Sequence, residues 1–594
     1  MAVTAHSGGR SKNLVLAAMI FAVAMTFIDQ TIVSIAVPEI QNELKLSSTG
    51  VQWAVNAYLL SLAAFFAYGG RLADTLGHRR VVVMGVLVFA TSSLLCGLTP
   101  KGAVAQTWIV AFRAVQGFGG ALMFPAALGI VVQTFALRER GKALALFFGI
   151  AGGLTAVGPI LGGWLTEWTW RSIFWVNIPV AVIALVLISL SKPVTEHRPA
   201  PMDYRGLALI VTGIGLSVFG FQQSQIWHWS NPGIWVCIVV GVALLVVFHR
   251  LELRTSSPLI QVRIFANRAF AVENLVLGIA MLVFIPYFFF ASEYAQISLG
   301  KSASGAGLYL LYFFIGFVIA SQFGGRMLDR GGAKRPVVLG CALCAVGFYL
   351  LAGKVTDLDF GNQEWYIVIA GAGMGLMLTP ASTDAVNRAS RLSYGEATGI
   401  TQTVRNYSAS LGLAVLGTIS VARFESHLRS SLVGQGVPAA QANSEAHHLS
   451  QAHRSTQGNS TIPHFVRLDF AYSTRTVFYV MAGIMAAAAL AAWLGLQRGV
   501  QEVDEGDAAG TPPDSGGSDG PGSGDDAQGG DAGGDTASGG TTPGGEGSGG
   551  GSSDGVGSGG DTAPGRTTPG GGSSGGTARG PHEPGAGKDG PGSP

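Results

Sequence analysis

Residues 69–81 read GGRLADTLGHRRV, and residues 324–337 repeat the pattern as GGRMLDRGGAKRPV. Each stretch follows an apolar run and reads GGR-x-x-D, then a turn with glycine, then a basic pair entering the next run. Paired glycines let two helices approach closely. One copy alone could be only a tight turn with a topology signal. Two copies predict two related halves, each with this turn between its second and third helices.

The composition around these turns is that of a membrane protein. Only 12% of the 594 residues are charged, whereas an ordinary soluble domain has about 25%. The Lys and Arg residues are scattered between apolar runs, so we expect no nucleic-acid partner. All four cysteines lie in apolar runs, and no His pair with zinc spacing accompanies them. We therefore expect them to pack as small apolar residues, and we expect neither a metal nor a cofactor.

Fourteen apolar runs approach the length of about 20 residues that a membrane helix needs. They lie at 14–37, 51–70, 81–99, 106–128, 142–163, 172–191, 206–223, 233–250, 269–291, 305–325, 336–353, 364–385, 397–420 and 473–496. The first run is longer than the apolar core of a signal peptide, so we expect it to be retained. The sequence predicts an all-α polytopic membrane protein with fourteen transmembrane helices.

The repeat divides these runs into parts. Residues 1–192 are predicted to form an N-terminal six-helix bundle, and 193–264 a linker with two inserted helices. Residues 265–500 form a C-terminal six-helix bundle that includes a long extracellular loop at 421–472. From 501 to 594 the chain is rich in Gly, Ser, Asp and Pro. Such a segment cannot bury enough apolar surface to offset its ordering entropy, so we predict a disordered cytoplasmic tail.

The distribution of Lys and Arg predicts the orientation. They concentrate in one alternate set of short segments, which includes the N-terminal segment and the turns at 71–80 and 326–335. Short loops rich in Lys and Arg stay in the cytoplasm. Both termini are therefore predicted to be cytoplasmic, in a chain that spans the plasma membrane many times.

Several of these stretches resemble a known family. GGRLADTLGHRR is similar to the signature between helices two and three of the major facilitator superfamily. Three further stretches resemble motifs of the fourteen-helix drug:proton antiporter family within this superfamily. They are FIDQTIVSIAVPEI (27–40) in the first run, RAVQGFGG (113–120) in the fourth and GIAGGLTAVGPILGG (149–163) in the fifth. The sequence departs from the pattern at Thr75, where a base is common, and at Ser34, where Asn is common. The resemblance covers about residues 14–496 and implies the major facilitator fold.

The resemblance also implies roles for two sets of residues. The turn motif comprises Gly70, Arg71, Asp74, Gly77, Arg79 and Arg80, with Gly325, Arg326 and Asp329 in the second copy. The antiporter motif comprises Gly149, Gly153, Gly158, Pro159, Gly162 and Gly163. Small residues permit close helix contact and proline interrupts the helix ladder, so we expect a packed gate between the halves. Ordinary small-residue packing is the alternative.

Two ionisable side chains lie deep inside apolar runs. Asp29 is about eight residues from the outer end of the first run, roughly 12 Å at 1.5 Å per residue. Arg113 lies at a similar depth in the fourth run. Such groups are functional candidates by default. We predict that Asp29 carries a proton or senses a cationic substrate and that Arg113 controls this, although a structural ion pair would have the same pattern.

Three more side chains complete the predicted site. Thr31 and Gln116 lie close to Asp29 and Arg113 along the same runs and are expected to extend the polar path. Arg405 lies in a second-half run, where it is either functional or an interfacial anchor whose long side chain reaches the aqueous boundary.

No G-x-x-x-x-G-K-[ST] pattern occurs in the sequence, so an ion gradient is the expected energy source. The leading prediction is a monomer that exchanges protons for small lipophilic or cationic compounds, such as antibiotics, dyes or secondary metabolites, and expels them by alternating access. No H-E-x-x-H or comparable set occurs, so no enzyme is expected. The alternatives are proton-coupled nutrient uptake, against which the fifth-run motif argues, and a non-transporting sensor that uses the tail.

Overall fold

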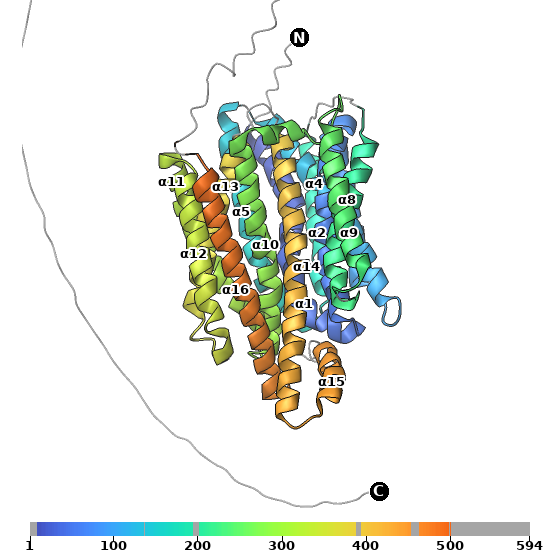
Figure 1. The fold of residues 1–594 in the computed structure, drawn as a ribbon. Helices are drawn as coiled ribbons and strands as arrows, with labels where there is room; N and C mark the ends of the chain where they lie inside the picture. Colours follow the sequence, from blue (N-terminus) through green and yellow to red (C-terminus); the bar gives the residue numbers. More distant parts are fainter. Residues whose placement is uncertain are drawn as a thin grey trace, which may run out of the picture. The chain divides into compact units, whose positions relative to one another are not determined.

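The computed structural model describes residues 9–135, 137–193, 201–227, 229–387, 394–452, 462–497 and 499. Within those ranges the chain is helical and has no β-strand (Figure 1). The tail predicted at 501–594 lies outside the described residues.

The helices follow the two-part plan of the repeat. The first part contains α1 (Gly9–Leu44), α2 (Ser48–Leu76), α3 (His78–Gly97), α4 (Ala105–Thr134), α5 (Leu137–Trp168), α6 (Ser172–Trp175) and α7 (Asn177–Ser191). Two more helices, α8 (Tyr204–Trp227) and α9 (Pro232–Glu252), follow and lead through the short η1 (Val262–Ala266) into the second part. That part contains α10 (Arg268–Ile297), α11 (Ala303–Gly331), α12 (Lys334–Ala352), η2 (Val355–Asp357), α13 (Glu364–Asn387), α14 (Tyr394–Gly434), α15 (Ala439–Ala452) and α16 (His464–Gly495).

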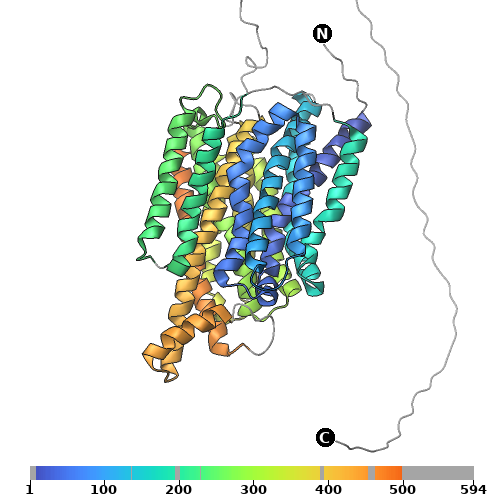
Figure 2. The ribbon, with the colours of Figure 1, turned by 90° about the vertical axis from the view of Figure 1, so that its right-hand side faces the viewer.

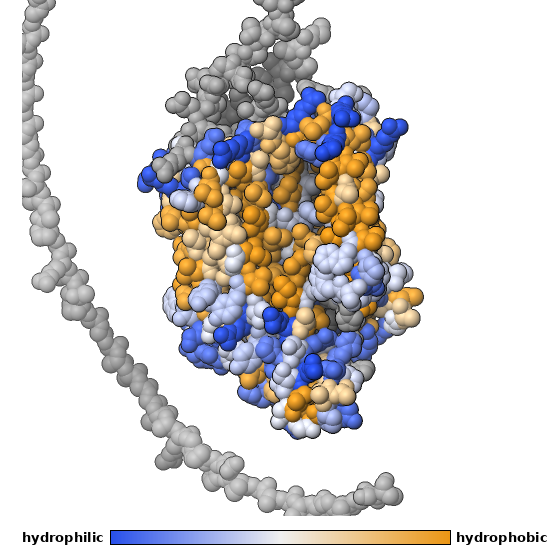
Figure 3. Space-filling view, in the orientation of Figure 1, coloured by the Kyte–Doolittle hydropathy of each residue, from blue (hydrophilic) through white to orange (hydrophobic). Residues whose placement is uncertain are grey.

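The helices have the length and composition of membrane spans. Thirteen of those in the described ranges are long and apolar enough to cross a membrane, with α6 and α7 counted as one. The remaining predicted run, 142–163, lies within α5, a 32-residue helix. On the side shown in Figure 3, hydrophobic side chains form a band across the helices, with hydrophilic side chains gathered at both ends. The predicted all-α polytopic fold is confirmed.

The two copies of the repeat have the same local structure. Helices α2 and α11 are both 29 residues long, and each begins after a serine, Ser47 or Ser302, whose hydroxyl accepts a backbone N–H three residues on. Such a cap satisfies a donor that the helix itself leaves free. Each helix ends before a glycine with positive φ, 93° at Gly77 and 78° at Gly332, a conformation that glycine adopts without steric cost.

The inserted helices lie against both halves. Helices α8 and α9 pack on each other, and α8 also packs against α2 and α14, as Figure 2 shows. At the centre of this contact the Asn56 side chain on α2 donates to Gln222 on α8 at 2.5 Å, and Ser410 on α14 donates to Asn56. All three side chains are fully buried. The insertion is therefore tied by hydrogen bonds to the seam between the halves.

The connection predicted as a loop at 421–472 is largely helical. Helix α14 continues for 41 residues to Gly434, α15 follows, and α16 begins at His464. Phe424, Leu428 and Leu432 recur every fourth residue and are buried, and the Phe424 ring lies 5.2 Å from that of Phe470. One apolar stripe is enough for a helix that packs against other helices. A search for uniformly apolar runs does not find such a stripe.

Candidate functional site

Asp29 and Arg113 form an ion pair inside the first half. Asp29 lies on α1 and Arg113 on α4, and Arg113 Nη1 lies 2.5 Å from Asp29 Oδ2. Both side chains are almost completely buried, with exposed fractions of 0% and 1%. A charge at such a depth is costly unless it is paired and hydrogen-bonded. The predicted proximity of these two residues is therefore present in the structure.

Neighbouring groups form further hydrogen bonds with this pair. Gln116 donates from Nε2 to Asp29 Oδ1 and accepts from Arg113 Nη1, both at 2.9 Å. The Arg113 Nε–H donates to the Ala54 carbonyl of α2 at 2.9 Å. The Arg113 guanidinium also lies 4.4 Å from the centre of the Tyr58 ring, within the range of a cation–π contact. Both Asp29 oxygens accept a hydrogen bond, so this arrangement suits the ionised carboxylate.

The sequence did not indicate the contribution of α2. The Ala54 carbonyl is a backbone group, and no sequence pattern marks it. Tyr58 could have been suspected, because it lies in a first-half run near Asn56, another polar residue. Neither residue was among the predicted site residues.

Thr31 lies apart from this cluster. Its hydroxyl donates to the Thr155 carbonyl of α5 at 3.0 Å, so it faces the fifth helix. Residues two apart on a helix point about 200° apart around its axis, which is why Thr31 and Asp29 face different neighbours. The expectation that Thr31 extends the Asp29 path does not match this geometry.

Arg405 also lies apart from the cluster. It is on α14, is partly exposed, and donates to Gln402 one turn earlier at 2.8 Å.

The antiporter motif places small residues on two faces of α5. Gly158 and Gly162 face α1, because a Cβ on either would overlap Thr31 or Ile32. Gly163 faces the second half, since a Cβ there would lie 2.7 Å from Ser304 Cα and 2.8 Å from the Ala303 carbonyl of α11. Gly307 of α11 packs in return on the Pro159 carbonyl. Gly149 and Gly153 lie nearer the start of the same helix.

The halves meet toward one end of the bundle. We call the end at which α1 begins the N-terminal face and the other end the opposite face. Toward the opposite face, the hydroxyls of Ser302 and Ser304, at the start of α11, donate to the carboxylate of Glu167, near the end of α5. Gln296 of α10 donates to the Ile35 carbonyl of α1 at 3.0 Å. A Cβ on Gly417 of α14 would lie 2.5 Å from Gln52 Oε1 of α2.

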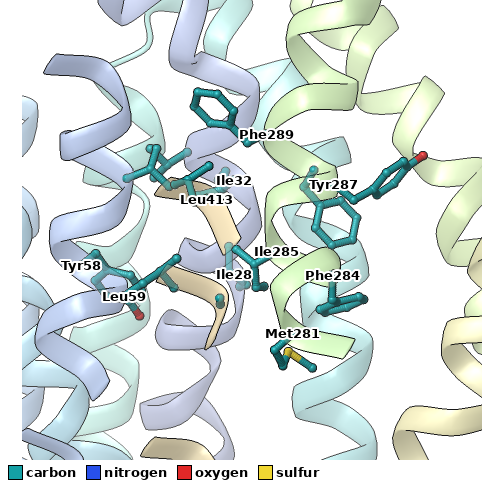
Figure 4. Close-up of a cluster of buried hydrophobic side chains, with 14 of the residues drawn as sticks. Ile28, Ile32, Tyr58, Leu59, Met281, Phe284, Ile285, Tyr287, Phe289 and Leu413 are labelled. Atoms are coloured by element: carbon teal, nitrogen blue, oxygen red, sulfur yellow. The ribbon is translucent and has the colours of Figure 1, made fainter. Parts of the chain in front are cut away.

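Apolar side chains fill the space between these contacts. Figure 4 shows Ile28 and Ile32 of α1, Ile285 and Phe289 of α10, and Leu413 of α14 in one cluster of buried apolar side chains. All five are less than a tenth exposed and belong to one hydrophobic cluster. The structure therefore has its two halves closed on each other in this layer.

The turn motif uses its first glycine for close packing in both copies. A Cβ on Gly69 would overlap the Ala121 carbonyl of α4, and a Cβ on Gly324 would lie 2.7 Å from the Leu376 carbonyl of α13. Gly70 has its nearest neighbour at 3.6 Å, and Gly325 faces open space. The predicted motif named the second glycine of each pair, whereas the close approach is made by the first.

The charged residues of the turn lie at the N-terminal face. Asp74 Oδ1 lies 3.5 Å from His78 Nε2 across Gly77. Arg79 and Arg80 are exposed and line a cavity of about 760 Å³ with Met84 and Pro193. In the second copy, Arg326 lies 5.8 Å from the centre of the Phe323 ring. Arg71 lies near the end of α2, and Asp329 lies near the end of α11.

Comparison with known proteins agrees with this architecture. Residues 19–413 match the model of the Major Facilitator Superfamily. Relatives include the tetracenomycin C resistance and export protein of Streptomyces glaucescens, 32% identical over 69% of this chain and 76% of that protein. The multidrug transporter protein MdtP of Bacillus subtilis is 30% identical over 72% and 79%. The puromycin resistance protein pur8 of Streptomyces alboniger is 31% identical over 70% and 82%.

Solved structures share the fold at low sequence identity. A bacterial homologue of the human lysosomal transporter Spinster, in an inward-facing and unoccupied conformation, has a TM-score of 0.56 and 16% identity, over 82% of this chain and 98% of that one. The xylose transporter XylE from E. coli has a TM-score of 0.53 and 11% identity, over 82% and 99%. The chain is a multi-pass membrane protein that belongs to the Major Facilitator Superfamily.

Proposed function

We propose that this protein exports small organic compounds across the plasma membrane by alternating access, in exchange for protons that Asp29 carries. The observation that supports this most directly is the buried Asp29–Arg113 pair, whose two charges neutralise each other inside the first half. The names of the relatives, which include an export protein, a resistance protein and a multidrug transporter, support efflux of an antibiotic or similar compound.

Protonation of Asp29 changes the contacts between α1 and α4. A protonated carboxyl has no charge to offset that of Arg113, and it gains an O–H that needs an acceptor. Breaking a buried ion pair costs about 3–5 kcal/mol. The bound proton therefore favours a different arrangement of α1, α2 and α4, the three helices that supply the cluster.

Helix α1 links this cluster to the contact between the halves. The side chain of Thr31, two residues after Asp29, lies against α5, and Ile32 fills the apolar layer in Figure 4. A movement of α1 therefore acts on both α5 and α10. In this proposal, the closed end opens with substrate bound and Asp29 ionised. A proton from the outside then binds Asp29 as substrate leaves, and its release to the cytoplasm restores the ion pair of this state.

The proposed orientation follows from the basic residues of the N-terminal face. Arg79 and Arg80, with Lys12 and Lys334, lie near this face, as do Arg326 and Arg330. If this face is cytoplasmic, the closed end is the outer one, and the structure is a state closed to the outside. The substrate is proposed to be lipophilic or cationic, because apolar and aromatic side chains surround the closed layer.

A transport assay tests the proposal. Cells that lack their own exporters are loaded with ethidium, a lipophilic cationic dye, and efflux is followed by fluorescence with and without a protonophore. We expect efflux by the wild type, loss of efflux with the protonophore, and loss in Asp29→Asn. Asp359→Asn is the matched control, because Asp359 is exposed and, within the described residues, its side chain accepts a hydrogen bond only from the nearby Gly361 N–H. Efflux that survives both the protonophore and Asp29→Asn would overturn the proton coupling.

A further inference from the structure

A second pair of carboxylates lies where the inserted helices meet the N-terminal face. Asp203 immediately precedes α8 and Glu252 is the last residue of α9. Glu252 is 2% exposed. A Cβ on Gly206 would lie 2.4 Å from Glu252 Oε1 and 2.7 Å from Asp203 Oδ2. Both oxygens therefore border the same small space, which is open because Gly206 has no side chain.

Among the residues that the structure describes, these two oxygens have no hydrogen-bond donor. Asp203 Oδ2 and Glu252 Oε1 are both buried. The other oxygen of each group is used: Asp203 Oδ1 accepts from the Gly206 N–H at 2.8 Å, and Glu252 Oε2 accepts from the Ile260 N–H at 3.4 Å. A buried carboxylate oxygen without a donor is costly. Two of them close together require a proton or a cation between them.

The described surroundings supply no countercharge. On the adjoining segments that the structure describes, the charged and titratable groups are exposed: Arg205 on α8, His249 and Arg250 on α9, and Arg254 and Arg263 in the connection that follows. Arg263 donates to the Leu253 carbonyl. In the described part of the chain, neither carboxylate forms an ion pair with any of them. The apolar side chains of Ile210, Phe248 and Ile260 form the small core nearby.

We propose that Asp203 and Glu252 together bind one proton, in a site separate from Asp29. Asp203 caps α8, and the start of a helix favours negative charge, so Asp203 holds the carboxylate. Glu252 holds the proton on Oε1 and donates it to Asp203 Oδ2. This hydrogen bond fastens the first turn of α8 to the last turn of α9. Loss of the proton leaves two negative charges facing each other and releases this contact.

The sign of the pH effect follows from linkage. An unfolded glutamate has a pKa of about 4.3 and is ionised at neutral pH. The folded protein holds the proton there, so it binds more protons than the unfolded chain. Its stability therefore falls as the pH rises and the site loses its proton.

Thermal unfolding of the full-length protein in detergent tests the proposal at about pH 5.5 and about pH 8.5, on either side of neutrality. Glu252→Gln keeps the shape and donates an amide N–H to Asp203, as the protonated glutamate does. We expect it to match the wild type at the lower pH and to unfold about 2–4 °C higher at the higher pH. Asp203→Asn can also cap α8 and donate to Glu252, and we expect the same result. Glu445→Gln, at an exposed glutamate of α15, is the matched control and should follow the wild type at both values.

Two outcomes would overturn the proposal. The first is that the unfolding temperature of the wild type has the same pH dependence as those of Glu252→Gln and Asp203→Asn. The second is that sodium, potassium or magnesium chloride raises the unfolding temperature of the wild type at the higher pH but not that of Glu252→Gln. The site would then hold a metal cation in place of the proton. Gly206→Ala checks the geometry independently. Its Cβ would separate the two carboxylates, and we expect it to lower the unfolding temperature mainly at the lower pH. None of these measurements depends on transport.

Discussion

The Arg113 guanidinium joins the three helices of the Asp29 cluster, α1, α2 and α4. Arg113 donates to Asp29, to Gln116 and to the Ala54 carbonyl, and it lies over the Tyr58 ring. Its planar fork suits several acceptors at once, which a lysine ammonium on a flexible chain does not. The same geometry explains why α2 belongs to the cluster although its contribution is a backbone carbonyl.

A double substitution separates charge from packing at this site. Arg113→Ala leaves Asp29 buried without a countercharge, and we expect a loss of about 3–5 kcal/mol in stability. Adding Asp29→Asn removes the uncompensated charge and should recover most of that loss. Thermal unfolding of the purified single and double variants measures this, with the exposed Arg423→Ala as control. A double variant as unstable as Arg113→Ala would show that the lost Ala54 hydrogen bond and packing decide the effect.

At the scale of elements, α5 contacts both halves through different glycines. Gly158 and Gly162 face α1, whereas Gly163 faces α11. The first two therefore belong to the interior of one half, and Gly163 belongs to the contact that would have to separate in the proposed alternating access. Helix α8 has a comparable position at the α2–α14 seam, where Asn56 joins Gln222 to Ser410.

Gly163→Ala tests the separation of these roles. Its Cβ would meet Ser304 Cα and the Ala303 carbonyl, which are backbone atoms that cannot rotate away. Overpacking costs about 1–3 kcal/mol, which would lower the population of the closed state by about 5- to 150-fold. We expect normal expression with slower dye efflux. Gly483→Ala is the control, because Gly483 has open space around its Cα. Equal efflux rates in the two variants would argue against a gate at Gly163.

At the scale of the whole molecule, the proposed alternating access requires the closed opposite face to open. Glu167 of α5 accepts from Ser304 of α11 across this face, so these two positions lie on facing sides of the contact between the halves. The four native cysteines lie in α3, α9 and α12, away from this contact.

We expect the pair Glu167→Cys and Ser304→Cys to lose efflux after oxidation and to regain it after reduction, because the disulfide holds the halves together. Each single variant should transport in both conditions. Cross-linking is followed by mobility on a gel and transport by dye fluorescence. Full efflux in the cross-linked protein would contradict a moving gate at this place.

The sequence by itself determined the membrane helices and the repeat. The membrane-spanning runs are mostly apolar, and a helix in lipid must satisfy its own backbone hydrogen bonds. Composition and length are therefore enough to predict these helices. The charge pair of Asp29 and Arg113 was also predictable, because ionisable residues are rare in such runs and stand out. The helical continuation at 421–434 was missed, because only one apolar stripe stabilises it.

The tertiary structure decided which side chains meet. It turned Thr31 toward α5, brought the Ala54 carbonyl and Tyr58 to Arg113, and gave the close packing to Gly69 and Gly324 rather than to Gly70 and Gly325. It also brought Asp203 and Glu252 together from opposite ends of the inserted pair. The physical reason is the same in each case. Helix formation depends on neighbours along the chain, whereas these contacts depend on how each helix is rotated and placed against helices distant in sequence.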